Sequence, residues 1–129
     1  MIIAGIGCRR GASAATIEAA LAAALARAGA EHIDVLATTA FKKDEEGILV
    51  AAATRRIPLI LIEQADLQRV NNHVTHSRRV AELTGVGSVA EAAALAAGGP
   101  AARLLVPRLV VGPVTCALAF AETPARALP

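Results

Sequence analysis

Short, continuous apolar runs alternate along the chain with stripes of apolar residues at helical spacing. The runs are rich in Ile, Val and Leu, which is typical of strands buried in a sheet, and they cover residues 1–4, 33–38, 58–62, 104–106 and 114–120. Ile17, Leu21 and Leu25 instead fall on one face of a helix, which Gly29 is expected to end. We predict further helices at residues 44–53, 66–71, 80–83 and 88–97.

The order of these elements predicts one α/β domain. A helix between two consecutive strands favours a right-handed crossover and a parallel pair. Residues 107–113 are instead consistent with an antiparallel return, and residues 109–111 could extend either strand beside them. We therefore predict a single three-layer α/β/α domain over residues 1–122, with a mixed, mostly parallel sheet of about five strands whose last pair is antiparallel. Residues 123–129, rich in Pro and Ala, should form a loose tail.

Composition excludes several classes of function. A formal net charge of +2 over 129 residues is too small for a general nucleic-acid binder, and the chain has no Trp or Tyr on which bases could stack. No apolar run is long enough to span a membrane, and Met1 leads into a strand without the basic segment of a signal peptide. We therefore expect a cytoplasmic protein that binds neither nucleic acid nor membrane.

The segment between the first predicted strand and the first predicted helix reads Gly-Ile-Gly-Cys-Arg-Arg-Gly over residues 5–11. Glycines allow a tight turn with outward-pointing amides, and the helix start, for which Ser13 is a candidate cap, adds positive partial charge. Two guanidinium groups then favour an anion. The predicted ligand contacts are Gly7, Cys8, Arg9, Arg10 and Gly11.

A purely structural interpretation of the same segment stays open. A turn between a strand and a helix often needs glycine, and exposed arginines are common. Neither nucleotide motif is complete, because Arg10 stands where a dinucleotide fingerprint has its third glycine and no Gly-Lys-Ser/Thr follows. The sequence therefore indicates an anion site but not a nucleotide site.

A second polar segment follows the second predicted strand. The carboxyl ends of parallel strands share one edge of a sheet, where ligands of open α/β folds bind. We therefore expect this segment to lie beside residues 7–11, although lysines and acids at a helix start are often only solvated. Its predicted ligand contacts are Thr38, Lys42 and Lys43, and its candidate general bases are Asp44 and Glu45.

The histidines and cysteines make weaker signals. His73 and His76 lack the usual zinc spacing and a third ligand, so we predict no metal site and no cofactor. His76, Ser77 and Arg78 are kept as predicted ligand contacts, with Ser77 equally suited to cap a helix. Two cysteines do not make a disulfide framework. Cys8 is either a reactive thiol or a small packed residue, and Cys116 should lie in the core.

Taken together, the motifs resemble the CobE family, which is equivalent to the C-terminal domain of CbiG from cobalamin (vitamin B12) biosynthesis. The resemblance covers nearly the whole chain in the right order, and it rests on residues 5–11, 36–45, 57–59, 85–95 and 115–119. It implies a corrin-pathway role in the bacterial cytoplasm and a functional cleft lined by residues 7–11 and 38–45. It also implies two further functional positions, Ser77 and Glu91, the second within a predicted capping box that begins at Ser88.

The resemblance leaves two functions open. One is a protein that binds a precorrin or hydrogenobyrinic acid-like tetrapyrrole, whose many carboxylates suit a basic edge, and that interacts with other cobalamin-pathway enzymes. The other is a hydrolase that opens the precorrin-5A lactone like full-length CbiG, which carries an N-terminal region that this chain is expected to lack. Outside the family, the alternative is an unrelated α/β domain that binds a small phosphorylated metabolite.

Overall fold

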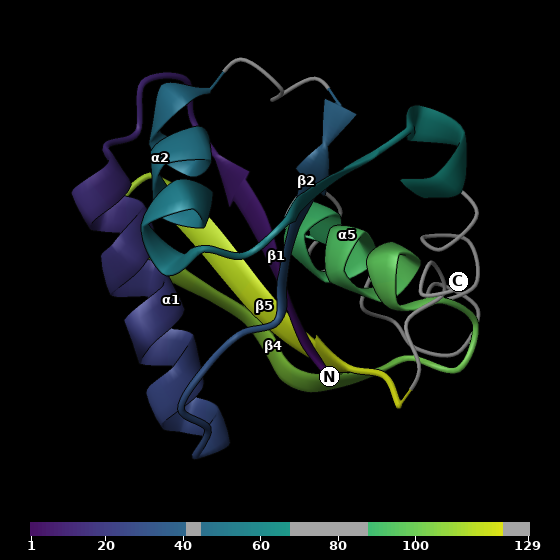
Figure 1. Cartoon of the computed structure of the whole chain (residues 1–129). Helices are drawn as coiled ribbons and strands as arrows, with labels where there is room; N and C mark the ends of the chain where they lie inside the picture. Colours follow the sequence, from purple (N-terminus) through teal and green to yellow (C-terminus); the bar gives the residue numbers. More distant parts are fainter. Residues whose placement is uncertain (41–44, 68–87, 123–129) are drawn as a thin grey trace.

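One mixed sheet of five strands forms the middle layer of the fold (Figure 1). The computed structural model describes residues 1–40, 45–67 and 88–122. The strand order is β3-β2-β1-β5-β4; β1 is parallel to β2 and β2 to β3, whereas β5 is antiparallel to both β1 and β4. The predicted mixed sheet with an antiparallel last pair is confirmed. The strands are β1 (Ile2–Cys8), β2 (Val35–Thr39), β3 (Leu59–Ile62), β4 (Arg103–Val111) and β5 (Val114–Phe120).

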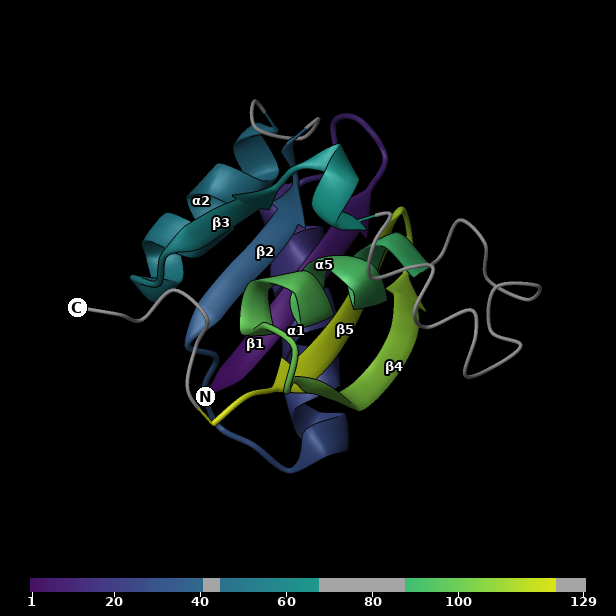
Figure 2. The ribbon, with the colours of Figure 1, turned by 90° about the vertical axis from the view of Figure 1, so that its right-hand side faces the viewer.

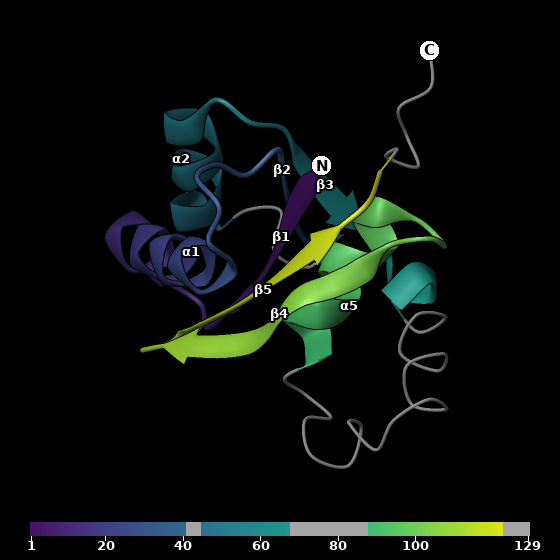
Figure 3. The same cartoon turned by 90° about the horizontal axis from the view of Figure 1, so that it is seen from below.

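Helices cover both faces of this sheet. Figure 3 shows α1 (Ala14–Ala28) and α2 (Glu46–Arg55) on one face and α5 (Ser88–Gly98) on the other. In Figure 2, α5 lies across the middle of the sheet, where it packs on β1, β5 and β2. Each face therefore has its own apolar core, and the core beneath α5 consists largely of alanines.

Local signals in the sequence place both ends of α1. The Ser13 hydroxyl accepts a hydrogen bond from the Thr16 amide at 3.1 Å, as an N-cap does. Gly29 ends the helix with a φ of 70°, a left-handed conformation that glycine adopts without steric cost. The predicted stripe of Ile17, Leu21 and Leu25 is buried. Prediction and structure agree for this helix from cap to cap.

The first strand is longer than predicted. Gly5, Gly7 and Cys8 belong to β1, so the turn begins only at Arg9. Gly5 pairs with Ala37 on one side and Ala117 on the other. A Cβ at Gly5 would collide with the Ala90 carbonyl oxygen of α5. This glycine therefore serves the close packing of a helix on the sheet.

The fourth strand is also longer than predicted, since residues 107–111 belong to β4 and leave only Gly112 and Pro113 as the turn. The register of β4 against β5 shifts between Leu104 and Val106 and again between Val106 and Leu109. Such bulges accommodate Pro107 in an edge strand, where a missing amide is tolerated.

Other predictions fall partly or wholly outside the described residues. Residues 64–67 are helical, which is the beginning of the helix expected near residue 66. The helix expected at residues 80–83 and the tail at residues 123–129 lie outside the described ranges. Within those ranges, no helix combines the length and the apolar character that a membrane crossing requires.

Candidate functional site

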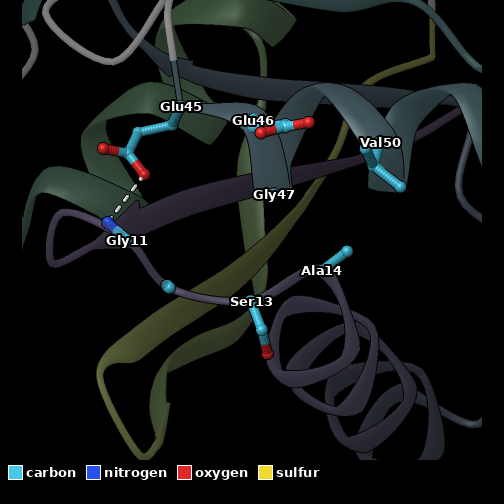
Figure 4. Close-up of a pocket in the computed structure, with 8 residues that line it drawn as sticks. Gly11, Ser13, Ala14, Glu45, Glu46, Gly47 and Val50 are labelled. Carbon is cyan, nitrogen blue, oxygen red and sulfur yellow. Dashed lines mark hydrogen bonds between the residues drawn. The ribbon is translucent and has the colours of Figure 1, made fainter.

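The parallel strands β1 and β2 end at the same edge of the sheet, which we call the carboxyl edge. A loop of residues 9–13 leads from β1 into α1 at this edge, and Glu45 stands immediately before α2. The Gly11 amide donates a hydrogen bond to Oε1 of Glu45 at 3.1 Å (Figure 4). The two segments that the sequence predicted to lie together are therefore in direct contact.

The two arginines of the loop present their side chains to solvent. Arg9 and Arg10 are both exposed. The loop backbone is held from several sides, because the Arg9 amide donates to the Pro113 carbonyl oxygen at 3.1 Å and the Ala12 amide donates to the Arg9 carbonyl oxygen at 3.2 Å. The guanidinium groups therefore extend from an anchored backbone, which limits the entropy lost when they bind an anion.

An open hollow of about 320 Å³ separates the beginnings of α1 and α2 (Figure 4). Its lining includes the two glutamates Glu45 and Glu46, whereas neither loop arginine contributes to it. Two carboxylates at this position disfavour an anion inside the hollow. An anion would therefore meet cationic groups at the exposed loop and not inside the hollow.

Gly47 is a residue whose importance the sequence analysis missed. A Cβ there would collide with the Ala12 carbonyl oxygen and would lie 3.2 Å from the Ala14 amide nitrogen. Gly47 thus lets the first turn of α2 approach the start of α1 and brings Glu45 within reach of Gly11. A glycine inside a predicted helix was the available signal for such a close approach.

Two threonine hydroxyls donate hydrogen bonds to consecutive carbonyl groups near the end of β1. The hydroxyl of Thr38, which is fully buried, donates to the Ile6 carbonyl oxygen at 2.8 Å, and that of Thr115 donates to the Gly7 carbonyl oxygen at 3.2 Å. Thr38 therefore links β2 to β1 in addition to the backbone ladder. Its predicted contact with a ligand stays a prediction.

Glu91 lies in the first turn of α5 and is only 6% exposed. Its Oε2 atom accepts a hydrogen bond from the Arg108 amide at 2.9 Å, at the second register shift of β4. The carboxylate thus supplies an acceptor for an amide at a bulge, where the strand ladder is disrupted. The expectation that Glu91 also contacts a ligand stays a prediction. The side chain of Ser88, the other half of the predicted capping box, lies outside the described part of the chain.

The two cysteines differ in environment. Cys116 is fully buried in β5, as predicted, and burial raises the pKa of its thiol to about 12, against a smaller opposing effect of the Arg55 charge. Cys8 is half-buried at the end of β1. Of the two, Cys8 is the thiol at the carboxyl edge.

Six of the predicted site residues lie outside the described ranges and stay predictions: Lys42, Lys43, Asp44, His76, Ser77 and Arg78. Among the described residues, no cluster of three or more His, Cys, Asp or Glu side chains could hold a metal ion. The described part of the candidate site therefore consists of the loop of residues 9–13, Glu45 and the ends of the neighbouring strands.

Comparisons with known proteins agree on one family. The family model described as "Cobalamin synthesis G C-terminus" matches residues 2–119. Protein CobE of Sinorhizobium sp. is 33% identical over 125 residues, which cover 95% of this chain and 81% of that protein.

Two crystal structures have the same fold. That of the cobalamin biosynthesis protein chiG from Agrobacterium tumefaciens str. C58 is 39% identical, with a TM-score of 0.74 over 95% of this chain and 99% of that chain. That of CobE, a protein from the cobalamin (vitamin B12) biosynthetic pathway, is 35% identical, with a TM-score of 0.80 over 95% of both chains.

Proposed function

We infer the function of this chain from its family. The chain belongs to the cobalamin synthesis G C-terminus family and is therefore a cobalamin biosynthesis protein of the CobE and CbiG type. We propose that it binds a precorrin or related tetrapyrrole intermediate at the carboxyl edge of its sheet. The observation that carries this proposal is the exposed pair Arg9 and Arg10 on a loop whose backbone is anchored. Tetrapyrroles of this pathway carry acetate and propionate groups, for which guanidinium forks are well suited.

The edge strand β4 exposes an apolar side chain near the same edge of the sheet. The strand register places Gly7, Thr115 and Val110 in one row across β1, β5 and β4, close to the carboxyl edge. Val110 is 58% exposed, more than the other exposed large apolar side chains of the described residues. In the proposal, the flat ring packs against Val110 while its peripheral carboxylates reach Arg9 and Arg10.

The arginines can be tested by an absorbance titration with hydrogenobyrinic acid. Arg9→Ala and Arg10→Ala should each weaken binding by about ten- to a hundredfold at low salt, because each removes a charge-assisted hydrogen bond. The affinity of the unaltered protein should also fall as ionic strength rises, since the contacts are exposed.

Arg27→Ala is the matched control. Arg27 is also exposed, but it lies in the last turn of α1 and hence away from the carboxyl edge where α1 begins. This variant should bind within about twofold of the unaltered protein, and its folding should change by no more than about 1 kcal/mol. Equal affinity in all three variants, or an equal loss in all three, would contradict a specific role for Arg9 and Arg10.

A further inference from the structure

We propose that the Glu45 carboxylate is an internal competitor that occupies the Gly11 amide in the free protein and that an anionic ligand must displace. The inference rests on the proposed function, because it concerns the same loop. It adds a way in which the protein sets its affinity for the ligand. The chemical class of the competing ligand is a carboxylate, the group that Glu45 itself presents to Gly11.

The amide of Gly11 is both occupied and accessible. It donates to Oε1 of Glu45 at 3.1 Å, and this hydrogen bond is exposed to solvent. Apart from Gly11 and its two chain neighbours, no atom of the described residues lies within 4 Å of the position that a Cβ of Gly11 would take. A carboxylate can therefore approach Gly11 from that side, but it reaches the amide only by displacing Glu45.

The Glu45 side chain is not committed to its own helix. Glu45 is the N-cap residue of α2, yet its carboxylate forms no capping hydrogen bond with that helix. N-cap side chains ordinarily accept a hydrogen bond from the second or third amide of their own helix. Glu45 reaches across to the other loop instead (Figure 4).

A displaced Glu45 carboxylate has another favourable position close by. The unpaired amides and the positive end of the dipole at the start of α2 stabilise a negative charge there. Displacement therefore exchanges one favourable environment of the carboxylate for another. This lowers the free-energy cost of displacing Glu45, so that the competition weakens ligand binding without preventing it.

The neighbouring charges add to this effect. Arg10 precedes Gly11 directly and is exposed, so the loop that carries this amide also carries a positive charge. In the free protein the negative charge of Glu45 is at that amide and opposes a second carboxylate. Removing Glu45 should therefore free the amide and also remove a repulsion.

The experiment compares Glu45→Ala with Glu46→Ala. Glu46 is the matched control, because it is the adjacent residue and lines the same hollow but is not the glutamate that accepts from Gly11. In absorbance titrations with hydrogenobyrinic acid, Glu45→Ala should bind about three- to tenfold more tightly than the unaltered protein. Glu46→Ala should change the affinity by less than about twofold, and Glu45→Gln should lie between the two.

A second measurement follows the Gly11 amide itself. Its cross-peak in an amide NMR spectrum should move in Glu45→Ala without any ligand, and citrate should shift it at lower concentration in Glu45→Ala than in Glu46→Ala. Equal effects of the two variants, or weaker binding by Glu45→Ala, would overturn the competitor role. If hydrogenobyrinic acid fails to bind any variant, the proposed function fails, and the citrate titration still decides the role of Glu45.

Discussion

Gly5 and Gly11 belong to one short motif, but different physical requirements account for them. Gly5 has close neighbours, since a Cβ would collide with the Ala90 carbonyl oxygen and would lie 2.8 Å from the Ala94 amide nitrogen. Gly11 has open space around it and a φ of 82°, a left-handed conformation that disfavours residues with a Cβ. Gly5 therefore serves helix packing, and Gly11 serves the turn.

The two glycines should respond differently to alanine. Gly5→Ala should lower the free energy of unfolding by about 3 kcal/mol, because the atoms in the way are backbone atoms of α5 and cannot move alone. Gly11→Ala should lower it by only about 1 kcal/mol, the cost of the left-handed conformation. Chemical denaturation of both variants gives the comparison. Equal losses would contradict the distinction between packing and turn.

Residue-level signals were informative where the interaction is local in sequence. Ser13 and Gly29 could be identified as helix ends because their partners lie within a few positions of them. The purpose of Gly5 could not be identified, since it depends on Ala90 and Ala94, far along the chain. A glycine-rich segment predicts a turn from sequence alone, whereas the structure continues β1 through most of it.

At the scale of elements, Glu91 joins α5 to β4. Its carboxylate accepts the Arg108 amide at the bulge of an edge strand. The helix start at Ser88 was predicted correctly, but the partner of Glu91 was not, because a register shift in a strand leaves no clear signal in sequence. This residue thus has a structural task that is independent of any ligand.

Substitutions of Glu91 can therefore distinguish a structural role of this residue from a ligand-binding role. Glu91→Ala should lower the free energy of unfolding by about 1–3 kcal/mol, because the Arg108 amide loses its acceptor. Glu91→Gln keeps an acceptor oxygen and should lower the free energy of unfolding by less than Glu91→Ala does. If Glu91 acts only in this way, folded Glu91→Gln should bind hydrogenobyrinic acid within about twofold of the unaltered protein. A severalfold change in affinity with unchanged stability would instead indicate a ligand contact.

At the scale of the whole molecule, the fold class and the shared carboxyl edge followed from the order of strands and helices. Parallel strands end together, so the segments after β1 and β2 had to be neighbours. The hydrogen bond between Gly11 and Glu45 did not follow, because it depends on how closely α2 approaches α1 at Gly47. Sequence thus located the candidate site, and packing between helices determines which groups in it are already engaged.

The central proposal is that this protein binds a tetrapyrrole at the carboxyl edge of its sheet. The most direct measurement mixes the purified protein with hydrogenobyrinic acid at low salt and records the visible spectrum and the mass of the recovered ligand. We predict a saturable shift of the visible absorption with the ligand's mass unchanged. An unaltered spectrum at excess ligand would contradict binding, and repeated formation of a product of different mass would indicate an enzyme instead of a protein that only binds the ligand.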